Sequence, residues 1–246
     1  METVICKTIK SISRDQWEAC RASKAGGDPF LSYDFFLLLE SSNSVGPNTG
    51  WIPFYITFKE NSIVVGVIIS FLKTHSQGEY VFDHSWADAY QRSGANYYPK
   101  LQVAVPFTPV SGERILVRPE NESQVDEMIS STKKLVKENN ISSLHVTFCN
   151  DSFVGVAEKN NLLVREGIQY HWFNRNYKSF DDFLGSLTYR KRKNIIKERK
   201  QARNFGGQIK SLTGNQLTDF ELEAFWHFYQ NTGQRKWGYP YLTKDF

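Results

Sequence analysis

His75–Pro109 reads HSQGEYVFDHSWADAYQRSGANYYPKLQVAVPFTP and follows an apolar, β-branched strand candidate, Ile63–Leu72. Aromatic and ionisable residues are interspersed along it with neither the two-residue period of a strand nor the 3.6-residue period of a helix. We therefore expect no regular amphipathic element there. A long irregular segment inside a compact domain is usually functional or disordered, and this one is too aromatic for disorder. The stretch therefore predicts a packed loop that lines a cleft.

Four segments of this stretch, HS-GEYVFD, WADAY, YYPKL and PFTP, resemble the FemAB-like peptidoglycan biosynthesis and recognition proteins. Two later segments resemble the same family in the same order, namely YRKRKN from Tyr189 and TGQRKWGYPYLTKDF over Thr232–Phe246. The resemblance covers nearly the whole chain. It implies an α/β (α+β) fold of the GNAT-like acyltransferase type, and a bacterial N-acyltransferase or aminoacyltransferase of peptidoglycan biosynthesis.

Composition agrees with a globular protein of one large domain or two smaller ones, since 40% of the 246 residues are hydrophobic and 15% are aromatic. The net charge of +4 says little about partners by itself. Cys6, Cys20 and Cys149 form no CxxC pair or Cys/His cluster, which argues against a disulfide framework or a zinc site and favours a reducing compartment. We find no signal peptide and no apolar run near the ~20 residues of a membrane span, so we expect a cytoplasmic protein without a transmembrane segment.

The order of expected elements predicts a mixed α/β fold with the Trp51–Lys73 hairpin at the centre of a sheet. The strand candidates are Val4–Lys10, Trp51–Lys59, Ile63–Lys73, Gly112–Val117, Ser143–Phe148, Leu162–Phe173 and Gln208–Leu212. The helix candidates are a Ser13-capped helix to Lys24, a Ser32-capped helix over Asp34–Ser41, then Ser123–Asn139, Asp151–Asn160, Phe180–Arg203 and Thr218–Thr232. With the resemblance, this order predicts a complete GNAT-like domain over residues 1–176.

Residues 177–246 are expected to hold a long basic helix and the start of a second GNAT-like unit. Gln208–Leu212 is the single strand candidate there, and a lone strand leaves its hydrogen-bonding edges unpaired. The resembled family continues past this point, so the chain is interpreted as C-terminally truncated. We expect it to be weak or inactive alone and to be completed by a downstream polypeptide.

Acyl transfer to an amine needs a group that takes the amine proton, and His75, Glu79 and Asp83 are the candidate catalytic residues. On an extended segment Glu79 and Asp83 point the same way, which would place two carboxylates in one cleft and raise one of their pKa values. The alternative is that the carboxylates bind loop backbone and that His75 is structural. Tyr97 to Lys100 and Pro106 to Pro109 would form a rigid wall suited to a ligand pocket or, alternatively, belong to a core aromatic cluster. The candidates for substrate binding are Tyr80, Trp86, Tyr97, Tyr98, Lys100, Phe107 and Thr108.

A basic helix is the candidate site for the phosphates of a carrier. On that helix Arg190, Lys193, Lys197 and Lys200 share one side, and the alternative is a merely solvated face. The cofactor-binding candidates are Arg190, Lys191, Arg192, Lys193, Lys236 and Trp237. The resemblance implies acyl-CoA or aminoacyl-tRNA as the donor; the acetyl-CoA loop of GNAT enzymes has no complete match, and we expect no tightly bound cofactor and no metal.

Three functions stay open at this point. The first is a FemAB-like N-acyltransferase that acts on a small-molecule or cell-wall precursor amine, with tRNA as a possible partner. The second is a non-catalytic recognition module for a cell-wall precursor or a nucleic acid. The third is an inactive remnant.

Overall fold

The computed structural model describes residues 1–22, 26–236 and 238–246. The strands are β1 Glu2–Cys6, β2 Trp51–Pro53, β3 Tyr55–Glu60, β4 Ile63–Ile68, β5 Ser70–Lys73, β6 Lys100–Val103, β7 Ile115–Val117 and β8 Leu144–Val146. The α-helices are α1 Arg14–Arg21, α2 Tyr33–Ser41, α3 His84–Arg92, α4 Val125–Glu138, α5 Ser152–Lys159, α6 Phe180–Gly185, α7 Tyr189–Arg203 and α8 Asp219–Arg235. Short 3₁₀ helices occupy Ile9–Ser11, Pro29–Leu31, Pro47–Thr49, Pro119–Gln124 and Gly214–Gln216. The predicted mixed α/β class is confirmed.

The chain forms two compact units, residues 1–164 together with 229–246, and residues 165–228. All eight strands belong to the first unit. The predicted division at residue 176 stays a prediction. In the described part of the chain, no helix combines the length and the apolar character needed to cross a membrane.

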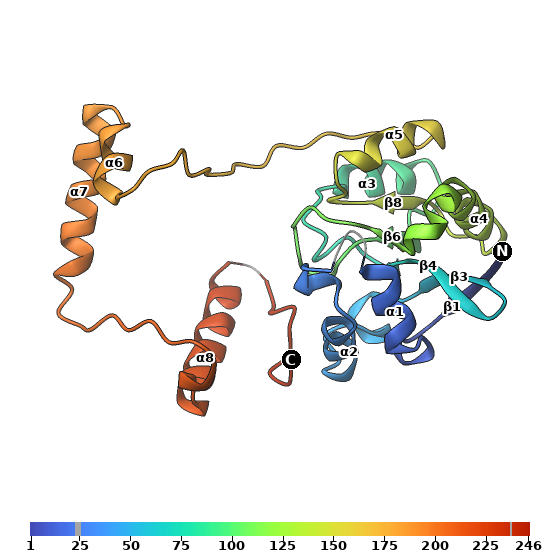
Figure 1. The fold of residues 1–246 in the computed structure, drawn as a ribbon, viewed down its shortest axis with the longest axis horizontal. Helices are drawn as coiled ribbons and strands as arrows, with labels where there is room; N and C mark the ends of the chain where they lie inside the picture. The colour runs from blue at the N-terminus through green and yellow to red at the C-terminus, as the bar shows by residue number, and fades with distance from the viewer. Residues whose placement is uncertain (23–25, 237) are drawn as a thin grey trace. The chain divides into compact units, whose positions relative to one another are not determined.

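Two four-stranded sheets form the centre of the first unit (Figure 1). One has the order β1-β3-β4-β7 and is antiparallel, whereas the other has the order β2-β5-β6-β8 and ends in the parallel pair β6–β8. The predicted hairpin is present, but Phe54 and Ile69 interrupt its two arms, so it contributes strands to both sheets. Its β3–β4 half is central in the first sheet, as predicted, and β2 is an edge strand of the second.

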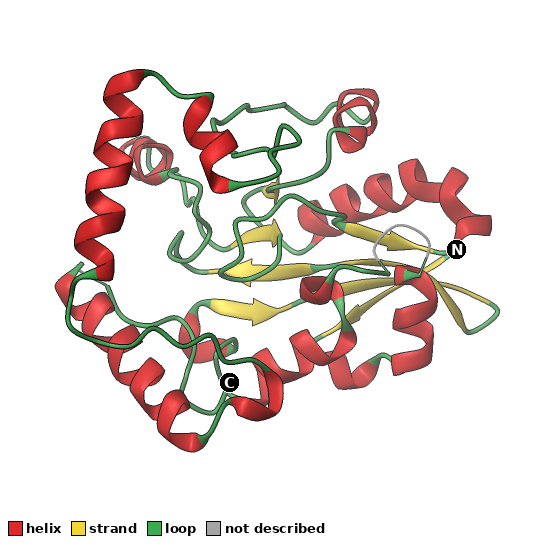
Figure 2. Cartoon of the chain, turned by 60° about the vertical axis from the view of Figure 1, so that its left-hand side comes forward, coloured by secondary structure: helices red, strands yellow, loops and turns green. Residues whose placement is uncertain are grey.

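Helices cover both faces of these strands, because side chains alternate between the faces along each strand (Figures 1 and 2). On one face α1 and α2 bury Trp17 and Phe36 against Tyr55 of β3. On the other face α4 buries Met128 in the same cluster as Ile56, the next residue of β3. The core therefore lies in two layers, one on each side of the strands.

The predicted N-caps of three helices are confirmed. Ser13 Oγ accepts a hydrogen bond from Gln16 N, and Ser32 Oγ accepts one from Phe35 N, each at 3.3 Å. Ser179 forms the predicted capping box with the third residue of α6. Such caps satisfy backbone N–H groups that have no partner inside the helix.

Four element predictions are wrong. Leu162–Phe173 and Gln208–Leu212 contain no strand, since β-type patterning gives no stability without a neighbouring strand to pair with. The helix expected over Phe180–Arg203 is two helices, because Thr188 has an extended ψ of 151° between them. The stretch expected to be a loop contains α3 and β6, and β6 is fixed by its pairing with β5 and β8.

Candidate active site

Four ionisable side chains meet inside the first unit, and we call Lys73, Glu79, Asp83 and Lys100 the buried quartet. Lys100 Nζ donates hydrogen bonds to Glu79 Oε2 at 2.7 Å and to Asp83 Oδ2 at 2.5 Å. Lys73 Nζ lies 4.0 Å from Glu79 Oε1. No member is more than 4% exposed. A buried charge is costly unless it is paired, and here two cations face two anions.

Strand register places the two lysines together. In the antiparallel pair β5–β6, Lys73 stands directly opposite Lys100, at adjoining ends of these strands. Like charges in opposite register repel each other. The segment that follows β5 brings Glu79 and Asp83 against the two ammonium groups, which neutralises them. The predicted meeting of the two carboxylates is thus confirmed, with both bound to one lysine.

Hydroxyl groups complete part of the hydrogen bonding. Tyr97 OH donates to Asp83 Oδ2 at 2.7 Å, and Lys100 Nζ donates to Ser76 Oγ at 3.1 Å. Ser76 Oγ also hydrogen-bonds Tyr98 OH at 2.7 Å. Together with the two hydrogen bonds from Lys100, they leave one oxygen of each carboxylate hydrogen-bonded.

The other oxygen of each carboxylate has no hydrogen-bond partner among the described residues. These two atoms are Glu79 Oε1 and Asp83 Oδ1, and both are buried. Buried polar atoms are nearly always satisfied in folded proteins, so an unpartnered carboxylate oxygen calls for an explanation such as a ligand or a catalytic role.

The pKa values of the two carboxyl groups move apart. Burial raises the pKa of Glu79, and the Lys100 hydrogen bond offsets only part of this effect. Burial acts on Asp83 in the same direction, but hydrogen bonds from Lys100, Ser76 and Tyr97 outweigh it and lower its pKa to about 2. Burial lowers the pKa of Lys73 to about 7, against the attraction of Glu79. The environment therefore favours the ionised form of Asp83, whereas it disfavours the charged forms of Glu79 and Lys73.

A column of aromatic rings leads from Lys73 to the surface. Lys73 Nζ lies 3.9 Å from the centroid of the Trp51 ring, which meets Phe107 edge-on at 5.4 Å. Phe107 stacks on Tyr241 at 5.0 Å and 7°. Tyr80 packs edge-on against Tyr241 at 6.2 Å. We call Trp51, Tyr80, Phe107 and Tyr241 the aromatic wall.

Tyr241 belongs to residues 239–246, which are part of the first unit and pack against residues of that unit that are distant in the sequence. Thr243 Oγ1 donates to Ser42 O at 2.8 Å, and Tyr229 OH accepts the backbone N–H of Tyr241 at 2.9 Å. Phe246 packs against the core beside α2. One face of the site is thus supplied by residues more than a hundred positions away from Glu79.

Glycine at position 78 is required by the aromatic wall. Gly78 has φ +77°, and a Cβ there would lie 2.8 Å from Phe107 Cδ1 and 3.1 Å from Trp51 Nε1. We expect Gly78→Ala to lower the free energy of unfolding by about 1 kcal/mol more than Gly94→Ala, measured by urea denaturation. Gly94 is the matched control, since it has φ +78° and no neighbour within 4 Å. Equal losses of stability in the two variants would mean that the aromatic wall accommodates the added methyl group at no cost in free energy.

A sequence model of the FemAB-like family, described as peptidoglycan biosynthesis/recognition, matches residues 8–246. The chain belongs to the FemAB-like family. A search of curated proteins found no match.

Two solved structures have a similar arrangement of elements. One is AAC(6′)-Iy in complex with the bisubstrate analogue CoA-S-monomethyl-acetylneamine, with 11% identity and a TM-score of 0.42 over 71% of this chain and 99% of that one. The other is the apo aminoglycoside antibiotic 6′-N-acetyltransferase AAC(6′)-IG from Acinetobacter haemolyticus, with 14% identity and a TM-score of 0.38 over 72% of this chain and 100% of that one. Similarity at this level supports no conclusion about the site or substrate of the FemAB-like chain.

His75 is held by backbone groups on both sides of its ring in this FemAB-like chain. Gln77 N donates to His75 Nδ1 at 3.2 Å, so the proton lies on Nε2, which donates to Thr49 O at 3.0 Å. Burial lowers the pKa of His75. These contacts favour the structural alternative, and the catalytic role of His75 stays a prediction.

The predicted substrate-binding residues divide into three groups. Tyr97, Tyr98 and Lys100 contact the buried carboxylates or Ser76, and Tyr80 and Phe107 belong to the aromatic wall. Trp86 is half exposed on α3, and Thr108 Oγ1 donates to Pro106 O at 3.0 Å. The prediction missed Lys73, Ser76, Trp51 and Tyr241. A lysine at the end of an apolar strand was the available signal for Lys73.

The predicted basic stripe lies on the exposed side of α7. Arg192 Nη2 donates to Leu187 O at 3.2 Å and Arg199 lies 3.8 Å from the Phe180 ring, so these two cations face α6. The residues of the stripe are all exposed, namely Arg190, Lys193, Lys197 and Lys200. The cofactor candidates Lys191 and Lys236 are exposed as well. Their carrier-binding role stays a prediction, and Trp237 lies outside the described residues.

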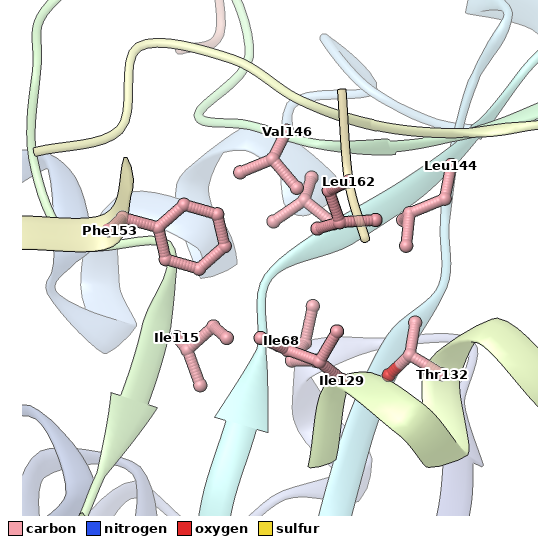
Figure 3. Close-up of a pocket in the computed structure, with 9 residues that line it drawn as sticks. Ile68, Ile115, Ile129, Thr132, Leu144, Val146, Phe153 and Leu162 are labelled. Carbon is pink, nitrogen blue, oxygen red and sulfur yellow. The ribbon is translucent and has the colours of Figure 1, made fainter. Parts of the chain in front are cut away.

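A small apolar space lies between the two sheets and α4, away from the buried quartet (Figure 3). It leaves room for no more than about one water molecule. Its lining is Ile68, Val103, Ile115, Ile129, Thr132, Leu144, Val146, Phe153 and Leu162. The one hydroxyl there, on Thr132, donates to Met128 O, so this space carries no chemistry.

No group of three or more metal-ligating side chains occurs within residues 1–22, 26–236 and 238–246. Glu79 and Asp83 are the two carboxylates of the quartet, and Lys100 binds both.

Proposed function

We propose that this FemAB-like chain is an N-acyltransferase, which transfers an acyl or aminoacyl group to an amine in peptidoglycan precursor biosynthesis. The observation that carries the proposal is Glu79, a buried carboxyl group with a raised pKa and one oxygen without a hydrogen-bond partner. Such a group suits general base catalysis because its pKa moves toward neutral pH. The family description supports the peptidoglycan precursor as acceptor.

In the proposed step, the nitrogen of the acceptor amine attacks the carbonyl carbon of a thioester or ester. The new N–C bond forms, the C–S or C–O bond breaks, and the amine proton moves to Glu79 Oε1. Lys100 holds the other oxygen of Glu79, and Asp83 balances the charge of Lys100. The leaving thiolate or alkoxide takes a proton in turn, so charge and atoms balance. Acyl-CoA and aminoacyl-tRNA both supply such a carbonyl.

The test is a transfer assay with each donor and with a peptidoglycan precursor that carries a free amine. We expect product with one donor, and a loss of turnover of at least tenfold in Glu79→Gln. Glu158→Gln is the matched control, because Glu158 is exposed on α5. Equal turnover by wild type and Glu79→Gln would remove Glu79 from the mechanism, and no turnover with either donor would contradict the proposed function.

A second candidate, a recognition module without catalysis, is favoured by one observation. Each member of the buried quartet is at most 4% exposed, as in a purely structural ion cluster. The same proteins separate the two candidates. A module would bind the precursor in equilibrium dialysis, give no transfer product, and lose no affinity in Glu79→Gln.

A further inference from the structure

The proposed reaction requires an opening, because the quartet is closed to solvent. Lys73 and Lys100 have 0% exposure, and Glu79 and Asp83 have 4% and 3%. Both strands that carry the lysines are inner strands of one sheet, because β5 pairs with β2 and β6, and β6 pairs with β5 and β8. The aromatic wall is different: Tyr80 and Tyr241 are 47% and 38% exposed, so solvent lies on its outer side.

We propose that the acceptor amine reaches the quartet through the aromatic wall, and that Tyr241 is the residue that positions this entrance by leaving or resuming its stack on Phe107. The inference rests on the proposed function for the identity of the amine. Its geometry is independent of catalysis. Tyr241, Phe107 and Trp51 form an unbroken series of ring contacts that ends on Lys73.

The inner end of the series is tied to the quartet through one carbonyl. Gln77 O accepts hydrogen bonds from Trp51 Nε1 at 3.1 Å and from Lys73 Nζ at 3.2 Å. A displacement of Trp51 that follows Phe107 would therefore uncover Lys73 and the unpartnered Oε1 of Glu79 beside it. The wall thus contacts Lys73, which lies 4.0 Å from the carboxylate oxygen that the proposed reaction uses.

Backbone conformation shows that the closed wall is held under strain. Tyr80 and Phe107 have φ of +56° and +61°, in the left-handed region that side chains rarely adopt. Such residues cost roughly 1–3 kcal/mol each, persist only where packing holds them, and gather at ligand clamps and switches. Both residues contact Tyr241. Release of Tyr241 removes the packing that holds them, which favours an open state.

Few contacts hold Tyr241 itself in place. Its backbone N–H donates to Tyr229 OH, whereas the next two residues are held by the packing of Leu242 against the core and by the hydrogen bonds of Thr243 to Ser44 Oγ at 3.1 Å and Ser42 O at 2.8 Å. Net hydrogen bonds of this kind contribute about 1 kcal/mol each. A local opening of this segment costs far less than unfolding the unit.

The experiment measures the chemical accessibility of Lys73 without any turnover. Lys73 has a pKa of about 7, so its amine reacts with an acylating reagent once solvent reaches it. We expect pulse labelling, read by mass spectrometry, to be about tenfold faster at Lys73 in Tyr241→Ala than in wild type. Tyr241→Phe keeps the stack and Tyr239→Ala alters a 91% exposed neighbour, so both should label like wild type.

Cys20 serves as the internal reference, because it is 1% exposed in the core beneath α1. Faster labelling of Lys73 with unchanged thiol labelling of Cys20 supports a local entrance. Unchanged labelling of Lys73, or a proportional rise at both residues, overturns the proposal, since Tyr241 would then cover nothing or hold the whole fold. Transfer activity with an unaffected Lys73 refutes only the entrance, whereas a responsive Lys73 in an inactive protein refutes only the proposed function.

Discussion

Replacing Lys100 with Met is expected to lower the free energy of unfolding by about 3–5 kcal/mol at pH 7, because breaking a buried ion pair leaves an uncompensated charge. Lys100 is the shared donor of Glu79 and Asp83, at 2.7 and 2.5 Å, and it is completely buried. Met has a similar length and leaves little cavity, so the loss reports the missing charge. Urea denaturation followed by far-UV circular dichroism measures it.

Lys73 is the matched control, since it stands opposite Lys100 in the same strand pair and is equally buried. Its ammonium donates to the carbonyl of Gln77 and lies 4.0 Å from the nearest carboxylate oxygen. Burial already lowers the pKa of Lys73 to about 7, so its surroundings stabilise the charged form only weakly. We expect Lys73→Met to cost less than about 1 kcal/mol. Equal losses in the two variants would contradict the assignment of Lys100 as the centre of the quartet.

Lowering the pH from 5 to 2 is expected to remove about 2 kcal/mol of stability through Asp83 alone. Its pKa is about 2 in the folded chain, against 3.8 for an ordinary aspartate. A lowered folded pKa gives stability that is complete above the unfolded pKa of about 4 and is lost as the pH falls toward 2. The pKa is lowered because hydrogen bonds from Lys100, Ser76 and Tyr97 stabilise the ionised carboxylate by more than burial destabilises it.

The control for this prediction is Asp83→Asn, which keeps the shape of the side chain and removes its titration. Urea midpoints of both proteins between pH 5 and 2 give the comparison. We expect the wild type to lose more stability over this range than Asp83→Asn by about 2 kcal/mol. Parallel loss in the two proteins would show that Asp83 is not held as an anion in the folded state.

Local sequence signals predicted several elements of both units because they act over a few residues. Ser13, Ser32 and Ser179 cap the helices that follow them, and the period of Ser123–Asn139 marks α4. The two strands that are missing share one cause. Leu162–Phe173 has the composition of a strand and no strand to pair with, and no local signal reports that absence.

In the candidate site too, the residues that the sequence identified are those that lie close together in the chain. The chain from His75 to Pro109 identified Glu79, Asp83 and their aromatic neighbours, since these residues lie close together in sequence. Lys73 enters only through the register of β5 on β6, and the aromatic wall needs Trp51 and Tyr241 from distant segments.

By itself, then, the sequence determined the class of fold, the caps of three helices and the two carboxylates, all of which depend on neighbouring residues. Tertiary structure alone decided which lysine holds those carboxylates, which oxygen of each has no hydrogen-bond partner, and which rings form the aromatic wall. The physical reason is that pKa values and burial depend on groups brought together by strand pairing and packing, whose positions in the chain are unrelated.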